Sequence, residues 1–122
     1  MKAVARIQPQ EYKSKLEEQF AAHLQSTIKE GAWRYEPIKL RLAQNTFYTP
    51  DFLEIGHDGT IWLYEVKGSW RGATRKTAKG SIHISQDKSR VKLKVAAKLY
   101  PWFRFVAVTK EKGEWKYEEI PS

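Results

Sequence analysis

The stretch YTPDFLEIGHDGTIWLYEVKG, residues 48–68, holds the clearest structural pattern in the chain. Apolar and polar residues alternate over 48–55 and again over 61–67, which predicts two strands of a half-buried sheet. Between the two runs, His57-Asp58-Gly59 fits a three-residue hairpin loop with Gly59 in the left-handed conformation. The stretch therefore predicts a β-hairpin in which the numbers of paired residues add up to 116.

Three charged residues stand on the face of this hairpin that should pack against a core. In the predicted register Asp51 lies opposite Glu65, and alternation places Lys67 on the same side. Two facing carboxylates repel each other, but a divalent cation would reverse the sign of that interaction, and Mg²⁺ prefers oxygen ligands. Lys67 could then orient or help deprotonate an attacking water, or stabilise charge on a phosphate. The alternative interpretation is a surface salt bridge between Lys67 and one acid, which is worth little.

The rest of the chain supplies helices and strands around this hairpin. Apolar residues recur every four positions before Gly31, and Pro101 ends a second such segment, so both segments are predicted to be amphipathic helices. The second helix would carry Val91, Val95 and Leu99 on one face and basic residues on another. The predicted elements are a helix over 11–30, a half-buried strand over 36–42, the hairpin, a mobile loop over 69–86, a helix over 87–100, a strand buried on both faces over 103–109 and a marginal final strand over 114–120.

This order of elements predicts an α/β fold built on one mixed sheet. The segment between the second hairpin strand and strand 103–109 is long enough for a right-handed crossover, which would make those two strands parallel. We expect an αβββαβ core, with a helix on each side of a four- to five-stranded sheet. At 122 residues the chain predicts a single domain over 11–122, preceded by a flexible segment over 1–10.

The net charge of +8 is concentrated in one part of the sequence. Residues 67–98 contain ten Lys or Arg and one acid, whereas bases and acids nearly balance elsewhere. Such a patch favours DNA or RNA as a partner, although it could also be a solvated basic face. The absence of cysteine excludes disulfides, cysteine-ligated zinc and a thiol nucleophile. No apolar run reaches the length of a membrane span, and the N-terminal residues lack the apolar core of a signal peptide, so we expect a cytoplasmic protein.

The charged residues of the hairpin also carry a resemblance to a known family. Pro50-Asp51, thirteen intervening residues and then Glu65-Val66-Lys67 resemble the signature of the PD-(D/E)XK nuclease superfamily. The predicted order of elements is similar to that of the superfamily's restriction-endonuclease-like core. The chain is further similar, over roughly residues 11–109, to small phage endonucleases related to the phage junction-resolving endonuclease I, in the segments EPIKLRLAQNTFYTPDF, YEVKGSW and RVKLKVAAKLYP.

The resemblance implies metal-dependent hydrolysis of a DNA phosphodiester with Mg²⁺ or Mn²⁺. It makes Asp51, Glu65 and the backbone carbonyl of Val66 metal ligands, and Lys67 the general catalyst. Many members add a glutamate from the first helix, for which Glu17 and Glu18 are candidates. Glu17 is three residues before Phe20 and seven before Leu24, so it lies along the predicted buried face, and we assign it as the fourth catalytic residue and a further metal ligand. Glu18 lies closer to the solvent side.

Several residues after the hairpin are candidates for DNA contacts. Trp70 and Arg71 could stack on or clamp a DNA strand, although Trp70 could equally cap the core. The predicted phosphate contacts are Arg75, Lys76, Lys79, Lys88, Arg90, Lys92 and Lys94. The three histidines, His23, His57 and His83, show no metal spacing and are interpreted as incidental.

The most specific function that the resemblance implies is cutting of branched DNA such as four-way junctions. Symmetric cutting needs two active sites, so a homodimer is expected, in a phage-infected or prophage-carrying bacterial cell. Two alternatives remain open. The chain could be a phage nuclease that nicks or cuts duplex DNA in packaging or host-DNA degradation, or a basic nucleic-acid-binding module without catalysis.

Overall fold

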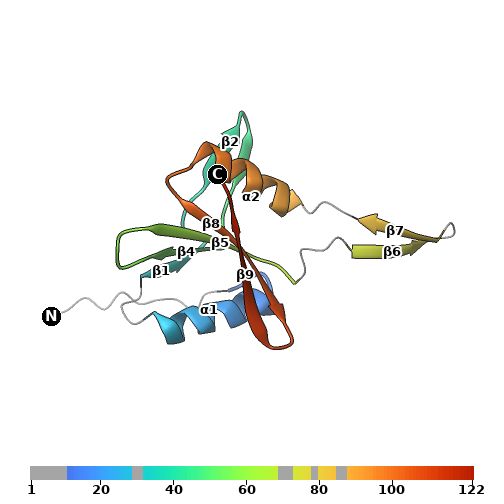
Figure 1. Cartoon of the computed structure of the whole chain (residues 1–122), viewed down its shortest axis with the longest axis horizontal. Helices are drawn as coiled ribbons and strands as arrows, with labels where there is room; N and C mark the ends of the chain where they lie inside the picture. The colour runs from blue at the N-terminus through green and yellow to red at the C-terminus, as the bar shows by residue number, and fades with distance from the viewer. Residues whose placement is uncertain (1–10, 29–31, 69–72, 78–79, 85–87) are drawn as a thin grey trace.

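The computed structural model describes residues 11–28, 32–68, 73–77, 80–84 and 88–122 (Figure 1). The predicted flexible segment 1–10 lies outside these residues. The elements in chain order are α1 (Lys15–Thr27), β1 (Trp33–Tyr35), β2 (Leu40–Ala43), β3 (Thr46–Tyr48), β4 (Phe52–Ile55), β5 (Ile61–Val66), β6 (Ala73–Thr77), β7 (Gly80–Ile84), α2 (Lys88–Leu99), β8 (Arg104–Glu111) and β9 (Glu114–Ile120).

A five-stranded mixed sheet forms the centre of the molecule, with the strand order β1-β4-β5-β8-β9. β5 and β8 are parallel, as the crossover through α2 predicts, and the other neighbouring strands are antiparallel. β8 lies inside the sheet and buries four consecutive residues, Phe105 to Val108, which confirms the prediction of a strand covered on both faces. The fold is therefore α+β with a mixed sheet, in agreement with the predicted class.

Each face of the sheet carries one helix and one core cluster. On one face, Phe20 and Leu24 of α1 pack against Val106 and other sheet residues. On the opposite face, Leu93 of α2 packs against a second set that includes Leu63. Alternate residues of β5 and β8 point into the two clusters, which is the ordinary consequence of the pleat. The helices thus approach the sheet from opposite sides (Figure 1).

The predicted hairpin register is confirmed between β4 and β5. Phe52 pairs with Tyr64 and Ile55 with Ile61, so the paired numbers add up to 116. Gly59 has φ +85°, in the left-handed region that favours glycine. The prediction of one strand over 48–55 was wrong, because β3 ends at Tyr48 and β4 begins at Phe52. Pro50 lies in the gap, and a proline supplies no N–H for a sheet ladder and restricts the residue before it.

The strand predicted over 36–42 does not join the main sheet. β2 covers only part of it and pairs with β3 in a separate two-stranded sheet. The main sheet instead takes β1 as its edge strand, whose Trp33 and Tyr35 pack their rings against Phe52 at centroid distances of 5.9 and 5.2 Å. Glu36 directly after β1 has φ +44°, so the chain turns there and the extended run is broken.

Both helices are present, with shorter bounds than the apolar pattern predicts. The first helix was predicted over 11–30 but begins after Ser14, whose side chain accepts a hydrogen bond from the Glu17 N–H at 3.1 Å, and ends before Ile28, which is extended. The second matches within one residue at each end. Its buried face is made by Leu93, Ala96 and Ala97, whereas the row Val91, Val95 and Leu99 is exposed.

Two further predictions need correction. The stretch predicted as a loop over 69–86 contains the antiparallel strands β6 and β7, which pair from Ala73–Ile84 to Thr77–Gly80 and form a sheet of their own (Figure 1). Its β-branched residues favour strands, but the lysines and glycines among them interrupt the alternation by which a strand is recognised in a sequence. β9 is not marginal, because all seven of its residues pair with β8.

Within the described part of the chain, no helix is long and apolar enough to cross a membrane.

Candidate active site

Asp51 is a buried carboxylate at the point where β4 begins. Only 7% of the residue is exposed. Its backbone N–H donates to the Tyr64 carbonyl at 2.9 Å, and its carbonyl accepts from the Glu36 N–H at 2.8 Å. Its side-chain Oδ2 accepts from the Val66 N–H, also at 2.8 Å. The carboxylate thus takes the place of a backbone acceptor for the last residue of β5, which fixes its position relative to that strand.

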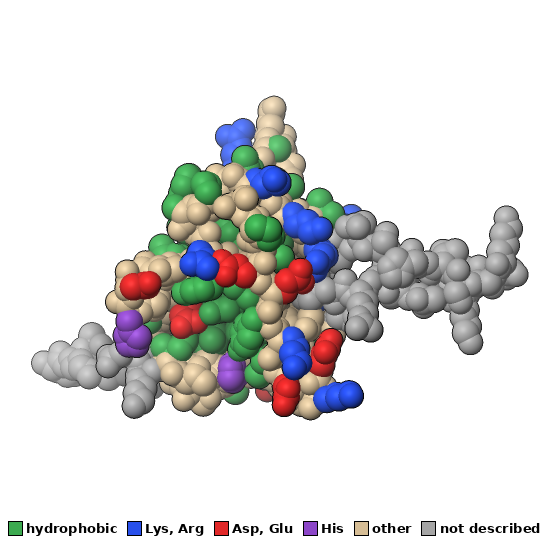
Figure 2. Space-filling model, viewed as in Figure 1, with side chains coloured by type: hydrophobic (Ala, Val, Ile, Leu, Met, Phe, Trp, Pro, Cys, Tyr) green, Lys and Arg blue, Asp and Glu red, His purple; other side chains and the backbone are tan. Residues whose placement is uncertain are grey.

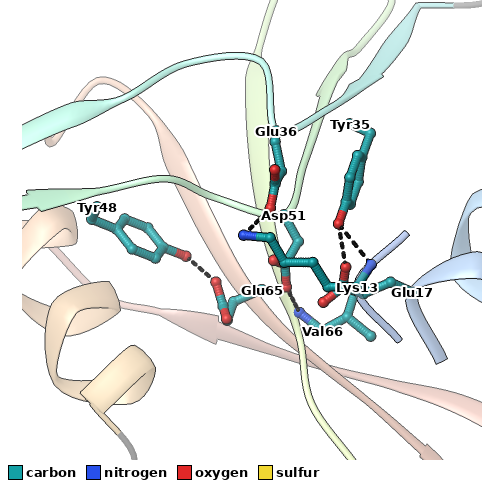
Figure 3. A network of polar contacts seen from close by, with 8 residues as sticks. All are labelled: Lys13, Glu17, Tyr35, Glu36, Tyr48, Asp51, Glu65 and Val66. Carbon is teal, nitrogen blue, oxygen red and sulfur yellow. Dashed lines mark hydrogen bonds and ion pairs between the residues drawn. The ribbon is translucent and has the colours of Figure 1, made fainter. Parts of the chain in front are cut away.

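Glu65 is the second buried carboxylate, on the penultimate position of β5, and is 5% exposed. Its Oε1 accepts a hydrogen bond from the Tyr48 hydroxyl at 2.6 Å. The side chain of Ser89, in the first turn of α2, also hydrogen-bonds Glu65. Glu65 is therefore held from two sides, by β3 and by α2. Asp51 lies between the Tyr48–Glu65 pair and the Tyr35–Glu17 pair in Figure 3.

Glu17 reaches the same region from the opposite face of the sheet. It is 8% exposed, whereas Glu18 is exposed, so the spacing argument separates the two residues correctly by burial. Its Oε1 accepts a hydrogen bond from the Tyr35 hydroxyl at 2.6 Å (Figure 3). Glu17 lies in the first turn of α1, where the helix dipole favours a negative charge.

Lys67 follows directly after β5 and is half-buried. Its backbone N–H donates to the Val108 carbonyl at 2.8 Å, which continues the pairing of β5 with β8 for one residue. Its ammonium group acts to lower the pKa of both Asp51 and Glu65. The Lys67 charge is therefore near enough to act on both carboxylates, which agrees with the alternation along the strand.

Burial dominates the electrostatics of the two acids. It raises the pKa of Asp51 to about 8, and the negative charges of Glu65 and Glu17 act in the same direction. Burial also raises the pKa of Glu65, although the hydrogen bonds from Tyr48 and Ser89 and the charge of Lys67 oppose it. Within the described part of the chain, Lys67 and the more distant Lys13 face three buried acids, which leaves the cluster short of positive charge. Such a site favours either a bound proton or a bound cation.

The donor set fits a hard divalent cation. Mg²⁺ is usually bound by one or two carboxylates and keeps several waters, and Asp51 and Glu65 provide two carboxylates at the same end of β5. Among the residues that the structure describes, no three acidic, histidine or cysteine side chains form one ready coordination cluster. Glu17 lies close enough to influence the pKa of both other acids, but it does not join them in such a cluster. The Val66 carbonyl as a ligand stays a prediction.

The predicted DNA-contact residues divide into three groups. Trp70, Arg71 and Lys79 lie outside the described residues, and of Arg75 and Lys76 only the strand β6 is described. On α2, Arg90 pairs with Glu118 of β9 at 3.1 Å, and the Lys92 ammonium donates to the Phe47 carbonyl at 2.9 Å. Both side chains thus contact other elements. Lys88 and Lys94 are exposed on the same helix, and basic side chains gather along α2 in Figure 2.

Sequence reasoning missed four residues around the acids: Tyr35, Tyr48, Ser89 and Lys13. The first three hydrogen-bond Glu17 or Glu65. Lys13 pairs with Glu36 at 2.7 Å. The negative charges of Glu17 and Asp51 help to raise the pKa of Lys13, so it is a second cation near the cluster (Figure 3). Tyr48 stands only three residues before Asp51 in the quoted stretch, and a tyrosine so close to a predicted acidic site is the one signal that could have identified it.

The comparisons with known proteins give no match. No family model fits the chain, and no curated protein and no solved structure is detectably similar to it.

Proposed function

We propose that the chain is a metal-dependent DNA endonuclease that hydrolyses phosphodiester bonds. The observation that carries the proposal is the pair of buried carboxylates, Asp51 and Glu65, at the end of a central strand, with the charge of Lys67 acting on both. A fold gains no stability from two acids placed together out of water. Their position is explained if a cation occupies the site during function. The resemblance of these three residues to the PD-(D/E)XK signature supports the same conclusion.

The chain's own groups can divide the work of hydrolysis. Asp51 and Glu65 would hold Mg²⁺ or Mn²⁺, which when bound supplies positive charge for the phosphate and lowers the pKa of water. The Lys67 ammonium can orient the attacking water or stabilise the negative charge that develops on the phosphate. Water adds to phosphorus as one P–O ester bond breaks. The proton of the water passes to solvent or to a neighbouring base, and the departing sugar oxygen takes a proton from solvent and leaves as a hydroxyl. Glu17, held by Tyr35, would add negative charge on the α1 side.

The basic residues support a nucleic acid as the substrate. Residues 67–98 hold ten Lys or Arg and one acid, and this segment begins at the proposed catalytic lysine. A polyanion drawn to the described part of this segment would lie near the carboxylates, because the charge of Lys67 acts on both acids and Ser89 of α2 hydrogen-bonds Glu65. Branched DNA such as a four-way junction, and a homodimer to cut it symmetrically, are the most specific form of the proposal and rest on the resemblance.

The test is cleavage of three labelled substrates: a four-way junction, a matched duplex and a single strand. Each is incubated with Mg²⁺ and with EDTA, for the unmodified chain and for Glu65→Gln, which keeps the side-chain volume and removes the charge. Junction cutting that needs the metal and disappears in the variant is expected. Equal cutting of the duplex would keep the nuclease and remove the junction preference. Binding without cutting in either Mg²⁺ or Mn²⁺ would refute the proposed activity.

A second function is favoured by one observation. The carboxylates do not form a three-residue coordination cluster within the described part of the chain, and the raised pKa of Asp51 would allow the site to hold a proton instead of a metal. The chain would then be a basic nucleic-acid-binding module. Salt-dependent DNA binding that is the same with Mg²⁺ and with EDTA, together with no cleavage, would favour this function over the nuclease.

A further inference from the structure

The separate sheet β2–β3 lies outside the main sheet, yet one of its residues reaches the proposed site. Tyr48, the last residue of β3, is 4% exposed and packs in the core cluster on the α2 side. Its hydroxyl donates to Glu65 Oε1 at 2.6 Å. A buried hydroxyl so close to a carboxylate oxygen forms a charge-assisted bond, which is shorter and stronger than a neutral one.

A second donor reaches the same carboxylate from another element. The Ser89 side chain hydrogen-bonds Glu65 from the first turn of α2. The two supporting elements are themselves joined, because the Lys92 ammonium of α2 donates to the Phe47 carbonyl of β3 at 2.9 Å. The Glu65 side chain on β5 is thus held by β3 and by α2, and these two elements are also bonded to each other.

We propose that Tyr48 and Ser89 are positioning residues, which hold the Glu65 carboxylate in the orientation that binds the catalytic metal. This role rests on the proposed function. A glutamate side chain can adopt several rotamers. It must be restricted to one of them before its carboxylate can coordinate a metal well. Hydrogen bonds to a metal-binding carboxylate supply that restriction, and loss of such a bond costs about 10- to 100-fold in metal affinity. The separate hairpin β2–β3 therefore contributes to the site through one hydroxyl.

The chain offers a matched control for this hydroxyl. The Tyr64 hydroxyl donates to Glu54 Oε1 at 2.5 Å, and Tyr64 is also a buried tyrosine on a strand. Its carboxylate partner belongs to the α1-side groove lined by Trp62 and Tyr117 and takes no part in the proposed site. Tyr48→Phe and Tyr64→Phe each remove one tyrosine–carboxylate hydrogen bond and keep the ring.

The experiment measures Mn²⁺ affinity without DNA, by titration calorimetry on the full chain, beside the thermal unfolding midpoint. Tyr48→Phe is expected to weaken Mn²⁺ binding about tenfold or more, and Tyr64→Phe to leave it within about twofold, because only the first hydroxyl touches a metal ligand. Ser89→Ala is expected to weaken binding as well, and it keeps the test valid if Tyr48→Phe does not fold.

The outcomes separate this role from the proposed function. Mn²⁺ binding by the unmodified chain that is unchanged in folded Tyr48→Phe and in Ser89→Ala would overturn the positioning role alone. An equal loss in Tyr64→Phe would show a general effect of a lost hydroxyl and would also overturn it. No Mn²⁺ binding by the unmodified chain would overturn the metal site and the positioning role together.

Discussion

The carboxylate of Asp51 accepts the Val66 N–H at 2.8 Å, so a side chain takes the place of a backbone partner at the end of β5. This bond ties the two strands of the hairpin together at the point where regular pairing ends at Phe52–Tyr64. It also holds Asp51 beside Glu65 although their charges repel. The local structure of the hairpin therefore enforces an unfavourable pair of acids.

The stability of the metal-free chain should fall as the pH rises from about 4 to about 8. The pKa of Asp51 is raised to about 8 by burial, so over this window the folded state holds a proton that the unfolded state has lost. The raised pKa of Glu65 acts in the same direction. Urea unfolding in EDTA at pH 5 and pH 8 should show a loss on the order of a few kcal/mol in the free energy of unfolding.

Added Mg²⁺ should recover part of this loss at pH 8 and have little effect at pH 5, because a protonated carboxyl is a poor ligand. Asp51→Asn should flatten the pH dependence, which separates the contribution of Asp51 from that of other titrating groups. Equal stability at the two pH values in both proteins would contradict the assignment of Asp51 as a buried acid with a raised pKa.

Isosteric removal of either acid should stabilise the protein and remove its activity. Asp51→Asn and Glu65→Gln delete one of two repelling charges but keep the volume and an oxygen that can accept the existing hydrogen bond. At pH 8 in EDTA each variant should gain about 1 kcal/mol or more in the free energy of unfolding, while cleavage falls at least about a hundredfold.

Glu54→Gln is the control for these two variants, since Glu54 also accepts a tyrosine hydroxyl but lies in the groove on the α1 side. Its cleavage rate should stay close to that of the unmodified chain. Retention of cleavage in Asp51→Asn or Glu65→Gln would argue against a direct role of the substituted acid.

Lys67→Met should separate catalysis from metal binding. The substitution keeps the aliphatic stem of the half-buried side chain and removes the ammonium group. Cleavage should fall at least about a hundredfold, but Mn²⁺ binding should persist, because the variant leaves both carboxylates and removes a competing positive charge. Lys110→Met is the matched control, since the Lys110 ammonium hydrogen-bonds Gln19 and lies over the Trp115 ring. Full cleavage by Lys67→Met would rule out Lys67 as the general catalyst.

The hairpin and its acids could be predicted from sequence because their arrangement is local. Alternation and a glycine-containing loop set the register of β4 and β5, and the register places Asp51 near Glu65 within fifteen residues. Burial of Glu17 follows from helical spacing for the same reason. These features need only the period of one element and the length of one turn.

Features that depend on packing between distant elements could not be predicted. Tyr35 reaches Glu17, and Ser89 reaches Glu65, only after two helices have packed on opposite faces of the sheet. The edge strand β1 is three residues long and too short to show a period. Spacing groups Val91, Val95 and Leu99 on one face of α2, but spacing alone does not tell which face of the helix packs on the sheet.

The exposed lysines of α2 should contribute to DNA affinity through phosphate contacts. Lys88→Ala and Lys94→Ala each remove an exposed charge, and neither substitution changes the buried face of α2. Each should weaken junction and duplex binding by a similar factor and lower the slope of log K against log salt by about 0.9, the value for one phosphate contact.

Lys116→Ala is the control, because Lys116 is an exposed lysine on β9 that pairs with Glu114. Fluorescence anisotropy over a salt series, with Ca²⁺ in place of Mg²⁺, measures the slopes. Slopes that are unchanged in both α2 variants, or lowered equally by Lys116→Ala, would show that DNA does not lie along this helix and would direct the search to the strands β6 and β7.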